Sequence, residues 1–163
     1  MKKVVLVYGI IAGLIVTGLM AFSTGYFSAK GDFEGGMIYG YASMLIASSM
    51  IFVGIKSFRD KYNGGTINFG KAFKIGLFIS LIASTIYVIG WLINYYCFMP
   101  DFMDKYAAVM IAKAKASGIS ADELAKQTAS MVQMKEWYKN PFFVILMTYV
   151  EILPVALVVT LIS

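Results

Sequence analysis

Four long apolar segments alternate with shorter polar ones along the chain, and this pattern predicts the fold. The segments cover residues 4–27, 36–55, 75–99 and 142–163, and each has at least 20 residues. A helix of roughly 20 residues crosses the ~30 Å hydrocarbon core of a bilayer. The pattern therefore predicts an all-α integral membrane protein with four transmembrane helices, folded as a single membrane domain over residues 1–163.

The long connection at residues 100–140 predicts two further helices. Pro100 ends the third apolar segment and suits the first turn of a new helix, because that turn needs no backbone N–H. Gly118 is typical of the residue just after a helix, and Ser120 with Glu123 forms a capping box for the next one. We expect an extracytoplasmic helical hairpin here, between the third and fourth transmembrane helices.

Small residues recur at four-residue steps in the first three apolar segments. Side chains at this spacing share one helix face, and small ones let two helix backbones approach closely. The stripes favour a tight bundle. They are compatible both with helix contacts within one chain and with contacts between protomers. The stripes are Gly9 with Gly13, Ala21 with Gly25, Gly36 with Gly40, Ser43 with Ala47, and Gly76 with Ser80 and Ser84.

Composition agrees with a membrane protein and argues against several function classes. Hydrophobic residues make up 60% of the chain and charged residues 14%, which leaves too little polar surface for a soluble fold of this size. There is no histidine and one cysteine, Cys97, so a Cys/His zinc site and an intrachain disulfide are excluded. A Ser/His or Cys/His catalytic pair is excluded as well. We predict a non-enzymatic protein without a metal or cofactor.

The distribution of the basic residues predicts the orientation in the membrane. They are densest at the N-terminus and in the connection between the second and third apolar segments, and the positive-inside rule places such segments in the cytoplasm. Both termini are then cytoplasmic. Each basic side chain near anionic headgroups contributes on the order of 1 kcal/mol to membrane binding, so we expect lipids rather than nucleic acid as the partner of this loop. The candidate residues for headgroup binding are Lys56, Arg59, Lys61, Lys71 and Lys74.

One acid, Glu151, lies inside an apolar segment. Counted from Phe142 at ~1.5 Å per residue, it is about 13 Å along the helix, near the middle of the bilayer. An ionised carboxylate at that depth costs at least a few kcal/mol. Pro154 follows three residues later and leaves a nearby backbone carbonyl without its usual helical partner. A polar position of this kind can bind an ion or carry a proton.

Polar side chains on the other apolar segments are predicted at a depth similar to that of Glu151. Two interpretations stay open. Either a protonated Glu151 donates an interhelical hydrogen bond that fixes helix register, or the polar level handles an ion or a lipid. The candidate intramembrane polar site consists of Glu151, Tyr87, Asn94 and Thr17, with Ser43 and Ser48 of the second segment at the same level.

The connection between the second and third segments has a distinctive sequence. It reads Gly54-Ile55-Lys56-Ser57-Phe58-Arg59-Asp60-Lys61 and then Gly64-Gly65-Thr66-Ile67-Asn68-Phe69-Gly70-Lys71-Ala72-Phe73-Lys74-Ile75-Gly76. With the Lys-Lys start, the four spans and the helical insert, it resembles the domain-of-unknown-function 4199 family, which is widespread in Bacteroidota. The resemblance implies a bacterial inner-membrane location and, because the family has no established activity, it implies no catalytic residues. The loop positions that match the family pattern are Lys56, Arg59, Asp60, Gly64, Gly65, Phe69, Lys71 and Lys74.

Two functions are compatible with these features. The first is a non-enzymatic accessory or scaffold protein of the inner membrane, which packs through its small-residue helix faces and binds lipid headgroups, a second copy or a membrane-protein partner. The alternative is a small oligomeric transporter that handles an ion or a lipid at Glu151. A polar, water-accessible cavity at Glu151 would favour the transporter. A dry, packed interior with an exposed apolar face on the hairpin would favour the accessory protein.

Overall fold

The computed structural model describes residues 1–163, and its regular elements are all helices. Four helical segments are long and apolar enough to cross a membrane, which confirms the all-α class and the four candidate spans. Two shorter helices, α4 (Phe102–Ala116) and α5 (Ala121–Trp137), occupy the long connection, called the insert from here on. The spans are α1 (Lys2–Lys30), α2 (Phe33–Tyr62), α3 (Phe69–Ile93) with its π-helical end η1 (Asn94–Phe98), and α6 (Pro141–Ile162).

Four of the helices, α2, α3, α5 and α6, begin at a side-chain cap. Asp32 accepts a hydrogen bond from the backbone N–H of Gly35 at 3.0 Å at the start of α2. Asn68 does the same for Lys71 at 2.9 Å, so α3 begins at Phe69 rather than at residue 75. These caps satisfy backbone donors that the first turn of a helix leaves free, and they let each helix extend past its apolar core.

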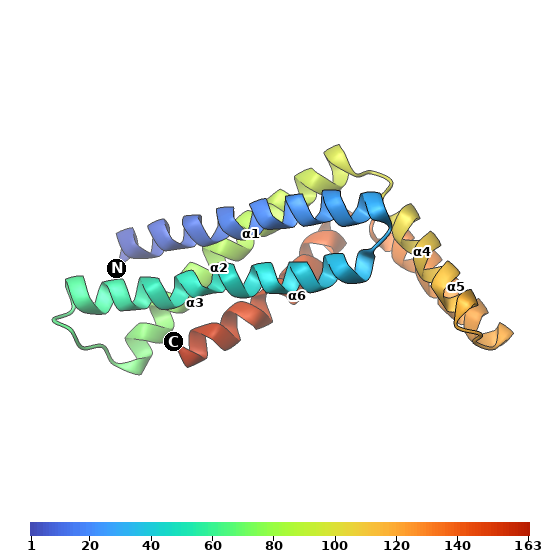
Figure 1. Ribbon diagram of the computed structural model, residues 1–163. Coiled ribbons are helices and arrows are strands. Elements are labelled where there is room, and N and C mark those ends of the chain that lie inside the picture. Colours follow the sequence, from blue (N-terminus) through green and yellow to red (C-terminus); the bar gives the residue numbers. More distant parts are fainter.

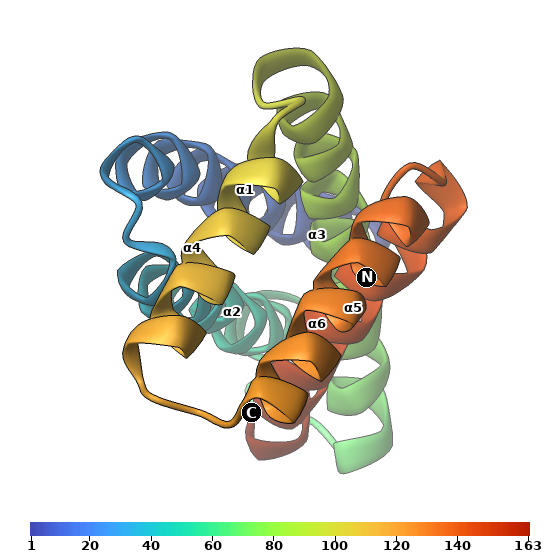
Figure 2. The ribbon, with the colours of Figure 1, turned by 90° about the vertical axis from the view of Figure 1, so that its right-hand side faces the viewer.

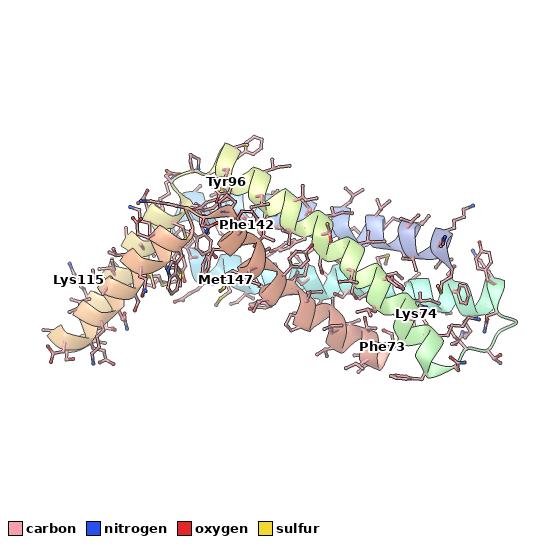
Figure 3. All side chains as sticks on the ribbon, turned by 180° about the vertical axis from the view of Figure 1, so that it is seen from behind. Phe73, Lys74, Tyr96, Lys115, Phe142 and Met147 are labelled. Atoms are coloured by element: carbon pink, nitrogen blue, oxygen red, sulfur yellow. The ribbon has the colours of Figure 1, made fainter.

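The four spans form one bundle with two different ends. α1 packs against α2 and α3, and α6 packs against the same two helices from another side. Both termini and the α2–α3 connection lie at one end of the bundle, whereas α4 and α5 extend beyond the other end (Figure 1). Figure 3 shows the same separation, with Lys74 at the first end and Lys115 at the far tip of the insert.

Close helix approach in the bundle depends on glycine. A Cβ added at Gly9 of α1 would lie 2.8 Å from the Cβ of Ile82 on α3, and one added at Gly13 would lie 2.8 Å from the Cβ of Ile86. Real Cβ atoms are not found that close to one another, so these two positions hold α1 against α3 only as glycine. The predicted stripe of Gly9 and Gly13 therefore serves a contact within the chain.

Large apolar side chains also cover the outside of the spans. On α6, Phe142, Leu146 and Val150 follow one another at four-residue steps, and all three are exposed. This spacing places them on a single helix face. Such a continuous apolar outer face suits a helix whose outer side meets lipid.

The insert is attached to the bundle by side-chain contacts as well as by the chain. Seen from the insert end, α4 lies in front of the ends of α1 and α2, and α5 lies in front of α6 (Figure 2). The Lys113 ammonium of α4 pairs with the Glu34 carboxylate of α2 at 2.9 Å, and Lys135 of α5 pairs with Asp104 of α4. α5 has no buried residue, so the insert's attachment to the bundle depends mainly on α4.

The last turn of α3 is wider than an α-helix. The backbone N–H of Met99 donates to the carbonyl of Asn94 at 2.9 Å, five residues back, which is the π-helical pattern. Within this turn Tyr95 is buried and its ring contacts those of Phe102 at 6.4 Å and Tyr138 at 5.7 Å, measured between ring centroids. The turn therefore directs the end of α3 toward the insert.

Candidate functional site

A cavity of about 300 Å³ lies where the spans meet the insert. All six α-helices contribute to its lining, as does Tyr138 between α5 and α6, and the lining is mainly apolar. Glu151 of α6 is one of the lining residues, and its side chain is exposed. The cavity is also lined by five methionines (Met20, Met37, Met103, Met110 and Met134) and seven aromatic residues (Phe27, Phe33, Tyr87, Trp91, Phe102, Tyr106 and Tyr138).

Aromatic side chains from three helices hold the insert over this cavity. The Phe102 ring of α4 lies 5.6 Å from that of Phe33 on α2 and 5.4 Å from that of Trp91 on α3, both edge to face. Tyr106, one turn after Phe102, contacts Phe33 edge to face at 5.3 Å. Such pairs contribute about 0.5–1.5 kcal/mol each beyond the area they bury. The rings form a cluster of Phe33, Trp91, Phe102 and Tyr106, called the aromatic roof below.

The carboxylate of Glu151 has no hydrogen-bond or ion-pair partner in the chain, since none of the side-chain contacts involves it. It lines the same cavity as Tyr138, and burial, followed by the negative charge of Glu151, raises the pKa of Tyr138. The other acid of the lining, Glu34, is paired with Lys113. Lysine and arginine are absent from the lining. The cavity therefore carries one uncompensated acidic group.

The structure brings together only part of the predicted polar site. Tyr87 is buried and lines the cavity together with Glu151. Asn94 is buried behind the lining, where its side-chain N–H donates to the sulfur of the lining residue Met20 at 3.5 Å. Thr17 packs against Gly90 of α3, and its hydroxyl oxygen is buried without a hydrogen-bond partner. Of the four predicted residues, Glu151 and Tyr87 thus line the cavity, whereas Asn94 and Thr17 do not.

The two serines of α2 also lie apart from Glu151. The Ser43 hydroxyl donates to the backbone carbonyl of Tyr39 at 2.6 Å, within its own helix. Ser48 lines a separate void of about 10 Å³ in the middle of the bundle, which has room for a single water at most. Both side chains contribute to packing among the helices rather than to the cavity.

The basic loop lies at the opposite end of the bundle from the cavity (Figure 3). Two of its five candidate side chains have partners within the loop: Arg59 pairs with Asp60 at 2.7 Å, and the Lys71 ammonium donates to the Asn63 side chain at 2.7 Å. The other three candidates, Lys56, Lys61 and Lys74, are exposed and make no ion pair. They are the free cations of this surface.

Several cavity residues were not predicted as site residues. Phe33 lies just after the cap of α2, and Phe102 and Tyr106 lie on one face of α4. The four-residue step from Phe102 to Tyr106 is visible in the sequence, but it indicates only an apolar helix face. That this face covers Glu151 follows from the tertiary structure alone.

Comparison with known proteins identifies the family of the chain but no individual similar protein or structure. The chain has no group of three or more His, Cys, Asp or Glu side chains placed to hold a metal ion. Neither a curated protein nor a solved structure matches it. A family model described as "Protein of unknown function (DUF4199)" matches residues 7–163. The chain therefore belongs to the DUF4199 family, over almost its entire length.

Proposed function

We propose that this protein is a non-enzymatic protein of the bacterial inner membrane that binds a small amphiphilic molecule in the cavity at Glu151. The observation that carries the proposal is the unpartnered carboxylate in a cavity lined mainly by aromatic rings and methionines. Binding sites combine a mainly apolar lining with a few polar groups that orient the ligand. Glu151 and the phenol of Tyr87 are such groups. This is the lipid-handling alternative of the two functions considered from the sequence.

The size of the cavity limits the ligand. Small-molecule sites have volumes of roughly 300–1,000 Å³, and this one, at about 300 Å³, is at the lower end. It therefore suits a small amphiphile or one part of a larger lipid. The ligand would contact the spans on one side and the aromatic roof on the other, so that movement of the insert would control its exchange.

Gly40→Leu is expected to reduce ligand occupancy. Gly40 lines the cavity, and a Cβ added there meets no atom within 4 Å, so leucine fits without a clash and takes up ligand space. We expect native mass spectrometry of the protein, taken from its own membrane in lipid-containing particles, to show a small-molecule adduct. Its occupancy should fall at least about tenfold in the variant, an effect of about 1.4 kcal/mol.

Gly18→Leu is the matched control for this experiment. Gly18 of α1 also has no atom within 4 Å of an added Cβ, and it is exposed outside the cavity. This variant should keep the adduct. A wild-type protein without any small-molecule adduct, or equal occupancy in both variants, would contradict the proposal.

The accessory-protein hypothesis has one observation in its favour. α5 has no buried residue, and a shallow groove along it is lined by Leu124, Thr128 and Val132 among others. An exposed apolar face outside the bundle is what a membrane-protein partner or a second copy would cover. In the same mass spectra, a recurring foreign subunit would favour this function, and a chain that carries only its small-molecule adduct would favour ligand binding.

We further propose that the basic loop holds anionic headgroups on the cytoplasmic side, with both termini there and the helical hairpin of α4 and α5 on the extracytoplasmic side.

The double variant Lys56→Gln with Lys74→Gln is expected to bind phosphatidylglycerol about tenfold or more weakly, because each charge contributes on the order of 1 kcal/mol. Native mass spectrometry with added lipid measures this. Lys115→Gln with Lys126→Gln removes the same charge from the insert and should leave binding unchanged, and an equal loss in both variants would refute the assignment.

A further inference from the structure

The charges around the cavity determine which amphiphile it can take. Its lining holds two acids and no basic side chain. The charge of Glu34 is compensated by Lys113 at 2.9 Å, whereas that of Glu151 is not compensated by any side chain. An anionic amphiphile such as a fatty acid would bring a second negative charge next to Glu151 with no lysine or arginine to receive it. The electrostatics of the cavity therefore disfavour anions.

The aromatic lining adds a second preference in the same direction. The face of an aromatic ring is the negative part of its quadrupole, and it attracts an ammonium group placed within about 6 Å of the ring centroid. Seven of the 19 lining residues are aromatic, and Tyr87, Trp91 and Tyr138 come from the same cavity as the Glu151 carboxylate. Aromatic rings are the groups by which proteins recognise quaternary ammonium ions, and the carboxylate in the same lining adds charge attraction.

The methionines determine how selective the site is for ligand shape. Five of the remaining lining residues are methionine, whose flexible and polarisable side chain adapts to different apolar shapes. They would accommodate the apolar part of the ligand without fixing one shape. Charge, rather than shape, is then the main selection criterion.

We propose that the ligand of the cavity is an organic cation, an amine or quaternary ammonium with an apolar body, whose charged group lies against Glu151 and among the surrounding aromatic rings. This inference rests on the proposed function, because it names the class of the amphiphile that the cavity binds. The competing possibility is a neutral amphiphile that accepts a hydrogen bond from a protonated Glu151. A cation and its neutral isostere, which differ only in charge, test whether the cavity prefers the positive charge.

The experiment compares benzyltrimethylammonium with its neutral carbon isostere, neopentylbenzene, on the full chain in dodecyl maltoside, a detergent whose headgroup carries no ammonium. The chain has two tryptophans, of which Trp91 lines the cavity and Trp137 does not. In a Trp137→Phe background, Trp91 fluorescence therefore reports binding, with protein-free micelles and free tryptophan in micelles as blanks. We expect the cation to bind at least about tenfold more tightly than the isostere.

Glu151→Gln should remove this advantage, because it deletes the charge and keeps the size of the side chain. Glu123→Gln is the matched control: it removes the same charge from an exposed position on α5 outside the cavity, and it should change the ratio less than about threefold. Equal binding of both probes to the wild-type chain would overturn the cation assignment and leave amphiphile binding in place. Binding of neither probe would overturn the cation assignment as well, and the adduct in the mass spectra of the wild-type protein decides separately whether the cavity binds an amphiphile. Both probe readouts use the wild-type side chain at residue 151, so they do not depend on the folding of the Glu151→Gln variant.

Discussion

Gly13→Leu is expected to lower the free energy of unfolding by about 3 kcal/mol, the upper part of the range for overpacking a tight interior. A Cβ at this position of α1 would lie 2.8 Å from the Cβ of Ile86, an atom directly attached to the backbone of α3. Because a Cβ cannot move without its backbone, the strain has to separate the two helices. Unfolding by sodium dodecyl sulfate in dodecyl maltoside, followed by circular dichroism, measures the effect.

Gly18→Leu is again the control, because the same side chain is added to the same helix at an exposed position with free space around it. Its free energy of unfolding should stay within about 0.5 kcal/mol of wild type. Equal destabilisation by both substitutions would mean that the cost arises from leucine in α1 itself. It would contradict the close contact of α1 with α3.

Phe102→Ala is expected to detach the insert while leaving the four spans folded. Phe102 contacts Phe33 and Trp91 at centroid distances of 5.6 and 5.4 Å, and removing a ring of this size costs 3–5 kcal/mol at a fully buried site. Phe102 is half-buried, so we expect about 2 kcal/mol, expressed as local opening of α4. Hydrogen exchange of the α4 amides should become about thirtyfold faster.

Phe98→Ala is the control for the insert. Phe98 lies four residues earlier and is 76% exposed, so its removal should leave exchange in α4 unchanged. Exchange in α2 and α3 should stay the same in both variants. Faster exchange throughout the chain after Phe102→Ala would show that insert and spans unfold together, contrary to the expectation.

The number and type of the elements could be predicted from the sequence because their signals are local. An apolar segment of 20 residues, the Gly118 ending and the Ser120 cap each act within one or two turns of helix. Gly9 and Gly13 could likewise be assigned to a helix contact from their spacing. Their partners, Ile82 and Ile86 on α3, could not, because the spacing on one helix does not identify the helix it faces.

The candidate site was harder to predict because depth along a helix says nothing about rotation around it. Thr17 and Asn94 were selected by depth, yet Thr17 faces Gly90 and Asn94 faces Met20. Tyr87 joins Glu151 in the cavity because its helix face points there. The aromatic roof combines Phe102 and Tyr106 of the insert with Phe33 and Trp91 of the spans, so it depends on contacts between residues far apart in the sequence.

The π-helical turn at the end of α3 has a consequence for how the chain tolerates insertions and deletions. The turn holds one residue more than the α-helical pattern allows, as the five-residue step between Met99 and Asn94 shows. Because the wide turn accommodates this additional residue, deleting one residue from it is expected to restore the α-helical pattern with little rotation of the chain that follows. Deleting one residue from the α-helical part of α3 would instead rotate the end of that helix by about 100° around its axis. The end of α3, from which the chain continues to Phe102, therefore tolerates the loss of a residue in the π-helical turn better than a loss anywhere earlier in the helix.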